Sequence, residues 1–196
     1  MQVAGYGVLD FELAWTPDVI NTIFFKWGAV EMQQQTLITY IDYVFIPSYV
    51  IFGAECILIV TRKLEGKLQQ TGLILTLVFL LAGIFDAVEN INLLIMLNNA
   101  GSFEAYNPFF ASLCASFKIG SLGAGMGFLY IASMTLILKR YTNSKRFLYL
   151  ILIGGGIIVM ALFFLWDIFI SLLIGGIYFI MLFFLIWRQR IYFNEA

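Results

Sequence analysis

Apolar residues fall into long runs separated by short polar segments, and this pattern predicts an all-α polytopic integral membrane protein. A helix needs about 20 mostly apolar residues to cross the hydrocarbon core of a bilayer. We expect five spans, at residues 37–60, 73–97, 109–138, 147–165 and 168–187. The last two form one apolar stretch about twice too long for a single span, so a turn is expected near Trp166 and Asp167.

The chain before the first span is predicted to be an extracytoplasmic segment, residues 1–36, and residues 37–196 a single transmembrane domain. Thr16, Pro17 and Asp18 have the order of cap, first-turn proline and acid that begins a helix. The apolar residues that then recur at helical spacing are Ile20, Ile23, Phe24, Trp27 and Val30. We expect an amphipathic helix over residues 17–35 on the outer leaflet, either as an anchor or as a lid over an outward-facing pocket.

Basic residues indicate the orientation, because lysine and arginine in short loops collect on the cytoplasmic side. With five spans, the basic residues that fall on one side are Arg62, Lys63, Lys67, Lys139, Arg140, Lys145, Arg146, Arg188 and Arg190. The loop at residues 98–107 falls on the other side and contains no lysine or arginine. The sequence therefore predicts an outside N-terminus and a cytoplasmic C-terminus.

Composition excludes several classes of protein. With 62% hydrophobic and 12% charged residues, a soluble domain could not keep its surface dispersed in water. The chain has no histidine, which removes imidazole metal ligands and Ser-His relays, and we expect neither a metal nor a cofactor. Cys56 and Cys114 lie in apolar stretches, as buried thiols do, and the clustered basic residues do not form a nucleic-acid surface.

The informative residues are ionisable groups placed inside the predicted spans. Counting about 1.5 Å per residue from the outer end of each span, Asp42, Glu89, Lys118 and Asp86 lie roughly 8, 12, 14 and 16 Å deep. Glu55 lies roughly 8 Å from the inner end of its span, where its carboxylate can reach the interface. Three spans therefore contribute charged groups to one layer in the outer half of the membrane.

Helical spacing groups these residues into faces. Asp86, Glu89 and Asn90 share one face of the second span, and Asn92 points elsewhere. Asp42 and Tyr49 align on the first span, where Pro47 is expected to kink the helix. The ligand- or ion-binding candidates are Asp42, Asp86, Glu89, Asn90 and Lys118, and the secondary pocket candidates are Tyr49, Cys114 and Ser121.

Three acids in this layer face a single lysine, so either one carboxyl group stays protonated or water, a cation or a cationic ligand supplies the missing charge. This favours a cavity that binds or transports an ion, a proton or a small polar or lipidic ligand. The alternatives are an acid/base enzyme on a lipid or isoprenoid, with Asp86 and Glu89 as acid and base, and a non-catalytic accessory or lipid-binding subunit. A lysine-carboxylate pair that only holds helices together is a further interpretation.

The expected partners are membrane lipids, with a homo-oligomer or a larger membrane complex also open, and no nucleic acid. A transporter of five spans would need a homo-oligomer, because no inverted repeat is evident in the sequence. The expected location is a bacterial cytoplasmic membrane.

Overall fold

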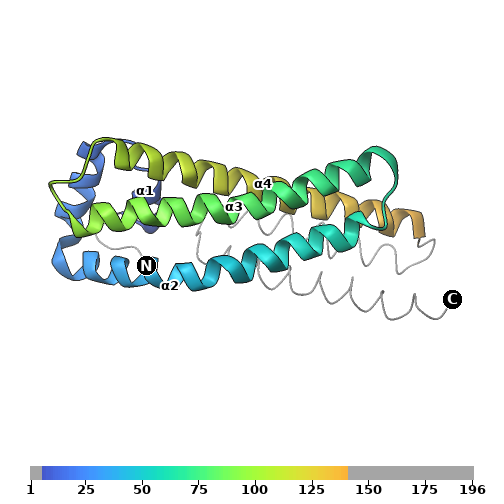
Figure 1. Cartoon of the computed structure of the whole chain (residues 1–196), viewed down its shortest axis with the longest axis horizontal. Coiled ribbons are helices and arrows are strands. Elements are labelled where there is room, and N and C mark those ends of the chain that lie inside the picture. The colour runs from blue at the N-terminus through green and yellow to red at the C-terminus, as the bar shows by residue number, and fades with distance from the viewer. Residues whose placement is uncertain (1–5, 141–196) are drawn as a thin grey trace. The chain divides into compact units, whose positions relative to one another are not determined.

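The structure, a computed structural model, describes residues 6–140 and places four helices within them. These are α1 (Val8–Glu12), α2 (Pro17–Thr61), α3 (Gly66–Asn98) and α4 (Tyr106–Arg140), shown in Figure 1. The spans expected at 147–165 and 168–187, and the turn between them, lie outside the described residues.

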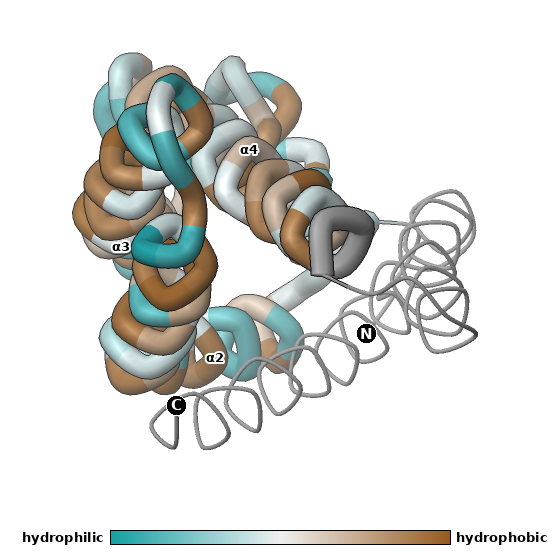
Figure 2. Tube along the Cα trace, turned by 90° about the vertical axis from the view of Figure 1, so that its right-hand side faces the viewer, coloured by the Kyte–Doolittle hydropathy of each residue, from teal (hydrophilic) through white to brown (hydrophobic). Residues whose placement is uncertain are grey.

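Three of these helices, α2, α3 and α4, are long and apolar enough to cross a membrane. Figure 2 shows apolar residues recurring along all three. The predicted spans at 37–60, 73–97 and 109–138 fall within them, so the prediction of an all-helical protein is confirmed for this part of the chain, with three helices long and apolar enough to span a membrane.

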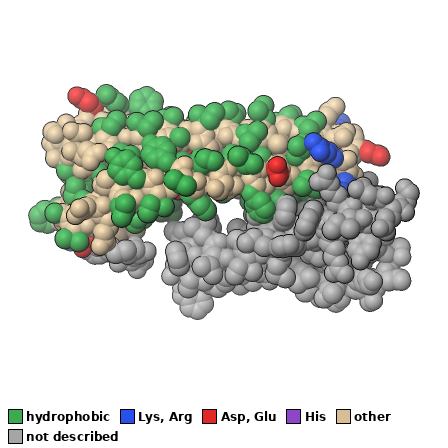
Figure 3. Space-filling view, turned by 60° about the horizontal axis from the view of Figure 1, so that its bottom comes forward, with side chains coloured by type: hydrophobic (Ala, Val, Ile, Leu, Met, Phe, Trp, Pro, Cys, Tyr) green, Lys and Arg blue, Asp and Glu red, His purple; other side chains and the backbone are tan. Residues whose placement is uncertain are grey.

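The long helices expose apolar side chains and bury polar ones. On α3, the exposed large apolar side chains are Leu68, Leu73, Ile74, Leu77, Leu80, Leu81, Ile84, Val88, Ile91 and Ile95. The buried face of the same helix contains Asp86, Glu89 and Asn90, which are 3%, 0% and 3% exposed. This distribution is the reverse of a soluble protein and suits lipid as the surrounding solvent (Figure 3).

The backbone of α2 leaves helical geometry at Gly28, where φ is 75° and ψ is −176°. This region of backbone space is open to glycine and strained for other residues. The helix begins at Pro17 as predicted, but its break lies at Gly28. Residues 29–36 are therefore continuous with the first span, and the helix runs on through Pro47, where a kink was expected.

The chain divides into two compact units. The first contains Met1–Ala54 and Leu75–Gly125, and the second contains Glu55–Ile74 and Met126–Ala196. Within the first unit, α1 and the start of α2 pack against the end of α3 and the start of α4. The apolar side chains that form this contact, called the α1 cluster below, are Phe11, Ala14, Ile20, Ile23, Phe24, Trp27, Leu93, Met96, Leu97 and Ala111.

The α1 cluster changes the interpretation of the predicted amphipathic helix. Ile20 and Ile23 are fully buried and Trp27 is 6% exposed, because they pack on protein and not on a lipid leaflet. Val30, expected on the same face, lies beyond the break at Gly28 and is 64% exposed.

Close approach of α2 and α3 in the first unit gives a first testable prediction. A Cβ atom added at Gly83 would lie 2.8 Å from Cγ2 of Val50, which is itself buried. We expect Gly83→Ala to lower the free energy of unfolding by about 1–3 kcal/mol, because the two helices must separate slightly. Gly120→Ala in α4 is the matched control, since no described atom lies within 4 Å of its added Cβ. Thermal unfolding in one detergent would compare them, and equal midpoints would contradict the packing.

Candidate functional site

A buried lysine on α4 contacts three carboxylates from two other helices, all within the first unit. Lys118 Nζ lies 2.8 Å from Glu89 Oε2, 3.1 Å from Asp86 Oδ1 and 3.6 Å from Glu12 Oε2. We call Lys118, Asp86, Glu89 and Glu12 the Lys118 cluster. The described helices thus hold an ion-pair network where the sequence placed charges inside spans.

Helical spacing explains how these residues meet. Asp86 and Glu89 are three residues apart on α3, so both carboxylates lie on the buried face of that helix. A lysine side chain is long enough to span the gap between two packed helices, so Lys118 on α4 can reach both carboxylates on α3. The side chain of Lys118 is 12% exposed, those of Asp86 and Glu89 are 4% and 0% exposed, and that of Glu12 is 18% exposed.

The two carboxylates of α3 have different surroundings. Asp86 has donors at both oxygens, because Lys118 Nζ faces Oδ1 and the hydroxyl of Tyr49 donates to Oδ2. Glu89 meets the ammonium group through the ion pair at Oε2, whereas its buried Oε1 has no hydrogen-bond partner among residues 6–140. Asp86 therefore has a hydrogen-bond donor at each oxygen, and Glu89 is the carboxyl group with unused hydrogen-bonding capacity.

A second polar contact lies beside the cluster. Asn90 Nδ2 donates a hydrogen bond of 2.8 Å to Asp42 Oδ2, which joins α3 to α2. Asp42 is half-buried, and Asn90 directly follows Glu89 in the chain. The structure therefore places Asp42 next to the Lys118 cluster through an amide, and not in an ion pair with the lysine.

The other candidates from the sequence are not members of the Lys118 cluster. Cys114 is buried as a free thiol, Ser121 is half-buried, and neither has a polar contact with the Lys118 cluster in the described structure. Asn92 faces α4, where its Oδ1 accepts a 3.0 Å hydrogen bond from Asn107 Nδ2. Glu55 is exposed and belongs to the second unit.

Sequence reasoning missed Glu12 as a member of the site. The only local signal was an acid within an apolar stretch, next to Phe11 and Leu13. Its place follows from α1, which Phe11 anchors in the α1 cluster by ring contacts with Phe24 and Trp27 at centroid distances of 5.6 and 5.2 Å.

Three carboxyl groups contact one ammonium group in this part of the first unit, and Asp42 lies beside them as a fourth carboxyl group. Within residues 6–140, no group of three or more His, Cys, Asp or Glu side chains has the geometry to hold a metal ion. The ammonium nitrogen of Lys118 contacts both Asp86 and Glu89, so carboxyl groups outnumber the ammonium group in this part of the described structure.

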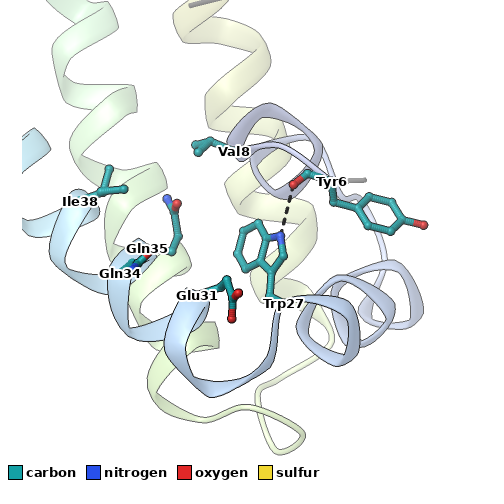
Figure 4. A pocket seen from close by; sticks show the side chains of 7 residues that line it. All are labelled: Tyr6, Val8, Trp27, Glu31, Gln34, Gln35 and Ile38. Carbon is teal, nitrogen blue, oxygen red and sulfur yellow. Dashed lines mark hydrogen bonds between the residues drawn. The ribbon is translucent and has the colours of Figure 1, made fainter. Parts of the chain in front are cut away.

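A small pocket of about 30 Å³ lies beside the break in α2, also in the first unit, with room for about two water molecules. The residues that line it are Tyr6, Val8, Trp27, Glu31, Gln34, Gln35 and Ile38. Figure 4 shows the indole nitrogen of Trp27 donating to the backbone oxygen of Tyr6, at 3.2 Å, with the Tyr6 ring turned away. This hydrogen bond ties the segment before α1 to α2.

Comparison with known proteins finds no matching family model, no matching curated protein and no matching solved structure.

Proposed function

We propose that the protein is an integral membrane protein that binds and releases protons at the Lys118 cluster, in support of proton transfer through its helical domain. The observation that carries this proposal is the excess of carboxyl groups, four with Asp42 included, over one ammonium group among apolar helices. An unpaired carboxylate in such surroundings costs several kcal/mol, and a bound proton removes that cost.

The contacts support a distinct role for each group. Asp86 positions Lys118, since Tyr49 and Lys118 donate to its two oxygens. Glu89 takes and releases the proton, because its Oε1 lacks a partner and its Oε2 touches the ammonium group at 2.8 Å. Lys118 compensates the negative charge whenever Glu89 is ionised, so the helices need not move apart when the proton leaves.

Asp42 extends the series of carboxyl groups toward α2. Its hydrogen bond with Asn90 places a second proton acceptor one residue away from Glu89 in the chain. A transfer between separated carboxyl groups requires water or a hydrogen-bonded side chain between them, and the Asn90 amide supports only the position of Asp42. With the orientation expected from the basic residues, these groups lie in the outer half of the membrane.

Proton flux into liposomes tests this function. Purified protein would be reconstituted in vesicles containing a pH-sensitive dye, and flux would be recorded under an imposed membrane potential. We expect Glu89→Gln to reduce the flux by about 100-fold, because a neutral amide cannot take up and release the proton. Glu55→Gln is the matched control, since the same change at an exposed acid outside the cluster leaves the carboxyl groups of the site intact.

Equal flux in the wild-type protein and the Glu89→Gln variant would contradict the proposal, as would wild-type flux no greater than that of empty vesicles. Thermal unfolding of both variants in the same detergent would verify that each is folded before its flux is compared.

A further inference from the structure

The Lys118 cluster is most exposed at Glu12. The Glu12 side chain is 18% exposed, compared with 4% for Asp86 and 0% for Glu89. The Glu12 carboxylate still reaches the ammonium group, at 3.6 Å from Lys118 Nζ. Glu12 is thus the carboxyl group that touches both the buried cluster and the surface of the first unit.

The helix that carries Glu12 is the shortest in the described structure. α1 has 5 residues, and Glu12 is its last residue. It packs in the first unit near the end of α3 and the beginning of α4 (Figure 1). A single helical turn can detach at a much smaller free-energy cost than a membrane-spanning helix, since stability is unevenly distributed within a protein.

Charged groups from all three long helices act on Glu12. Lys118 faces it from α4, Asp86 and Glu89 lie on α3 around the same ammonium group, and Asp42 acts from α2. Burial raises the pKa of Glu12 above its usual range, Lys118 lowers it, and the carboxylates of Asp86 and Asp42 raise it again, with a net upward shift. Glu12 therefore keeps a proton at a higher pH than an exposed glutamate does.

We infer that Glu12 is the proton-exchange residue of the cluster, passing protons between water at the surface of the first unit and Glu89 through small movements of α1. This inference rests on the proposed function and adds the route by which protons enter the Lys118 cluster. The Glu12 carboxyl group gives its proton to a water molecule, which passes a proton on to a Glu89 carboxylate oxygen, while Lys118 stays charged beside both carboxyl groups. Release toward water follows the reverse order.

A pH jump followed by time-resolved infrared spectroscopy tests the route in the full-length protein. The carbonyl stretch of protonated carboxylic acids reports proton uptake, and the band that disappears in Glu89→Gln belongs to Glu89. We expect Glu12→Gln to slow the rise of the Glu89 band by about 100-fold and to leave its final amplitude nearly unchanged. Glu104→Gln is the matched control, because Glu104 is an exposed glutamate in the loop between α3 and α4.

Chemical rescue separates proton exchange from a structural role of Glu12. In Glu12→Ala, added formate should restore much of the rate, because a small weak acid can occupy the space and carry the proton. A normal rate in Glu12→Gln, or a slow rate in Glu12→Ala that formate leaves unchanged, would overturn the inference while the Glu89 band still supports the proposed function. Absence of any Glu89 band in the wild-type protein would overturn the proposed function itself, and this inference with it.

Discussion

Replacing Lys118 with methionine should lower the free energy of unfolding by about 3–5 kcal/mol at neutral pH, the usual cost of removing one partner from a buried ion pair. Methionine keeps most of the side-chain volume but leaves Asp86, Glu89 and Glu12 without their common cation. The loss should shrink as the pH falls, because protonation neutralises the abandoned carboxylates. The free energy of unfolding of both proteins would be measured in a series of detergent mixtures at several pH values.

The control for this change is Lys26→Met, at an exposed lysine of α2, which we expect to alter stability by less than about 0.5 kcal/mol. Adding Glu89→Gln to Lys118→Met should recover part of the loss, since one buried negative charge is then removed. If the double variant Lys118→Met, Glu89→Gln recovered the full free energy of unfolding, and Glu89→Gln alone left proton flux unchanged, the ion pair of Lys118 and Glu89 would serve only to hold helices together. A Lys118→Met variant as stable as Lys26→Met would contradict the buried network.

Replacing Phe11 with alanine should detach α1, with a loss of about 3–5 kcal/mol, as for other fully buried phenylalanines. Phe11 is 0% exposed and packs against Phe24 and Trp27. Because α1 is short, the loss of stability should appear mainly as local opening of α1. We expect the amides of residues 8–14 to exchange hydrogen at least about 100-fold faster, measured by mass spectrometry in detergent.

Phe25→Ala is the matched control for this prediction, because Phe25 lies next to the α1 cluster in the chain but is 86% exposed. Its effect on exchange within residues 8–14 should be small. Unchanged exchange in Phe11→Ala would mean that α1 is held by contacts other than the α1 cluster.

Much of the fold in residues 6–140 could be predicted because lipid imposes a simple rule. A helix in hydrocarbon must satisfy its own backbone and present apolar side chains outward, so long apolar runs locate the C-terminal ends of α2, α3 and α4 to within two residues. The same helices begin 20, 7 and 3 residues before the predicted spans at 37, 73 and 109, because apolar runs do not mark the polar turns that precede them. The spacing of Asp86, Glu89 and Asn90 likewise placed them on one face of α3, which the structure buries. Both inferences depend only on local sequence and helical geometry.

Other features depended on contacts between distant segments. The break in α2 falls at Gly28, since a backbone with positive φ is tolerated by glycine, whereas the helix continues through Pro47. Helical spacing on residues 17–27 correctly identified an apolar face but could not indicate what covers it. The face packs against α1, α3 and α4, which are separated from it along the chain.

By itself, the sequence determined that this is an apolar helical protein and predicted a layer of three acids and one lysine on three spans. Only the tertiary structure decided which charges touch: it joined Asp86, Glu89 and Glu12 at Lys118 and turned Asp42 toward Asn90. The physical reason is that hydropathy and helical spacing act on neighbouring residues, whereas an ion pair depends on helix contacts across the chain. Glu12 reached the site because an aromatic residue beside it, Phe11, docks α1 into the helices.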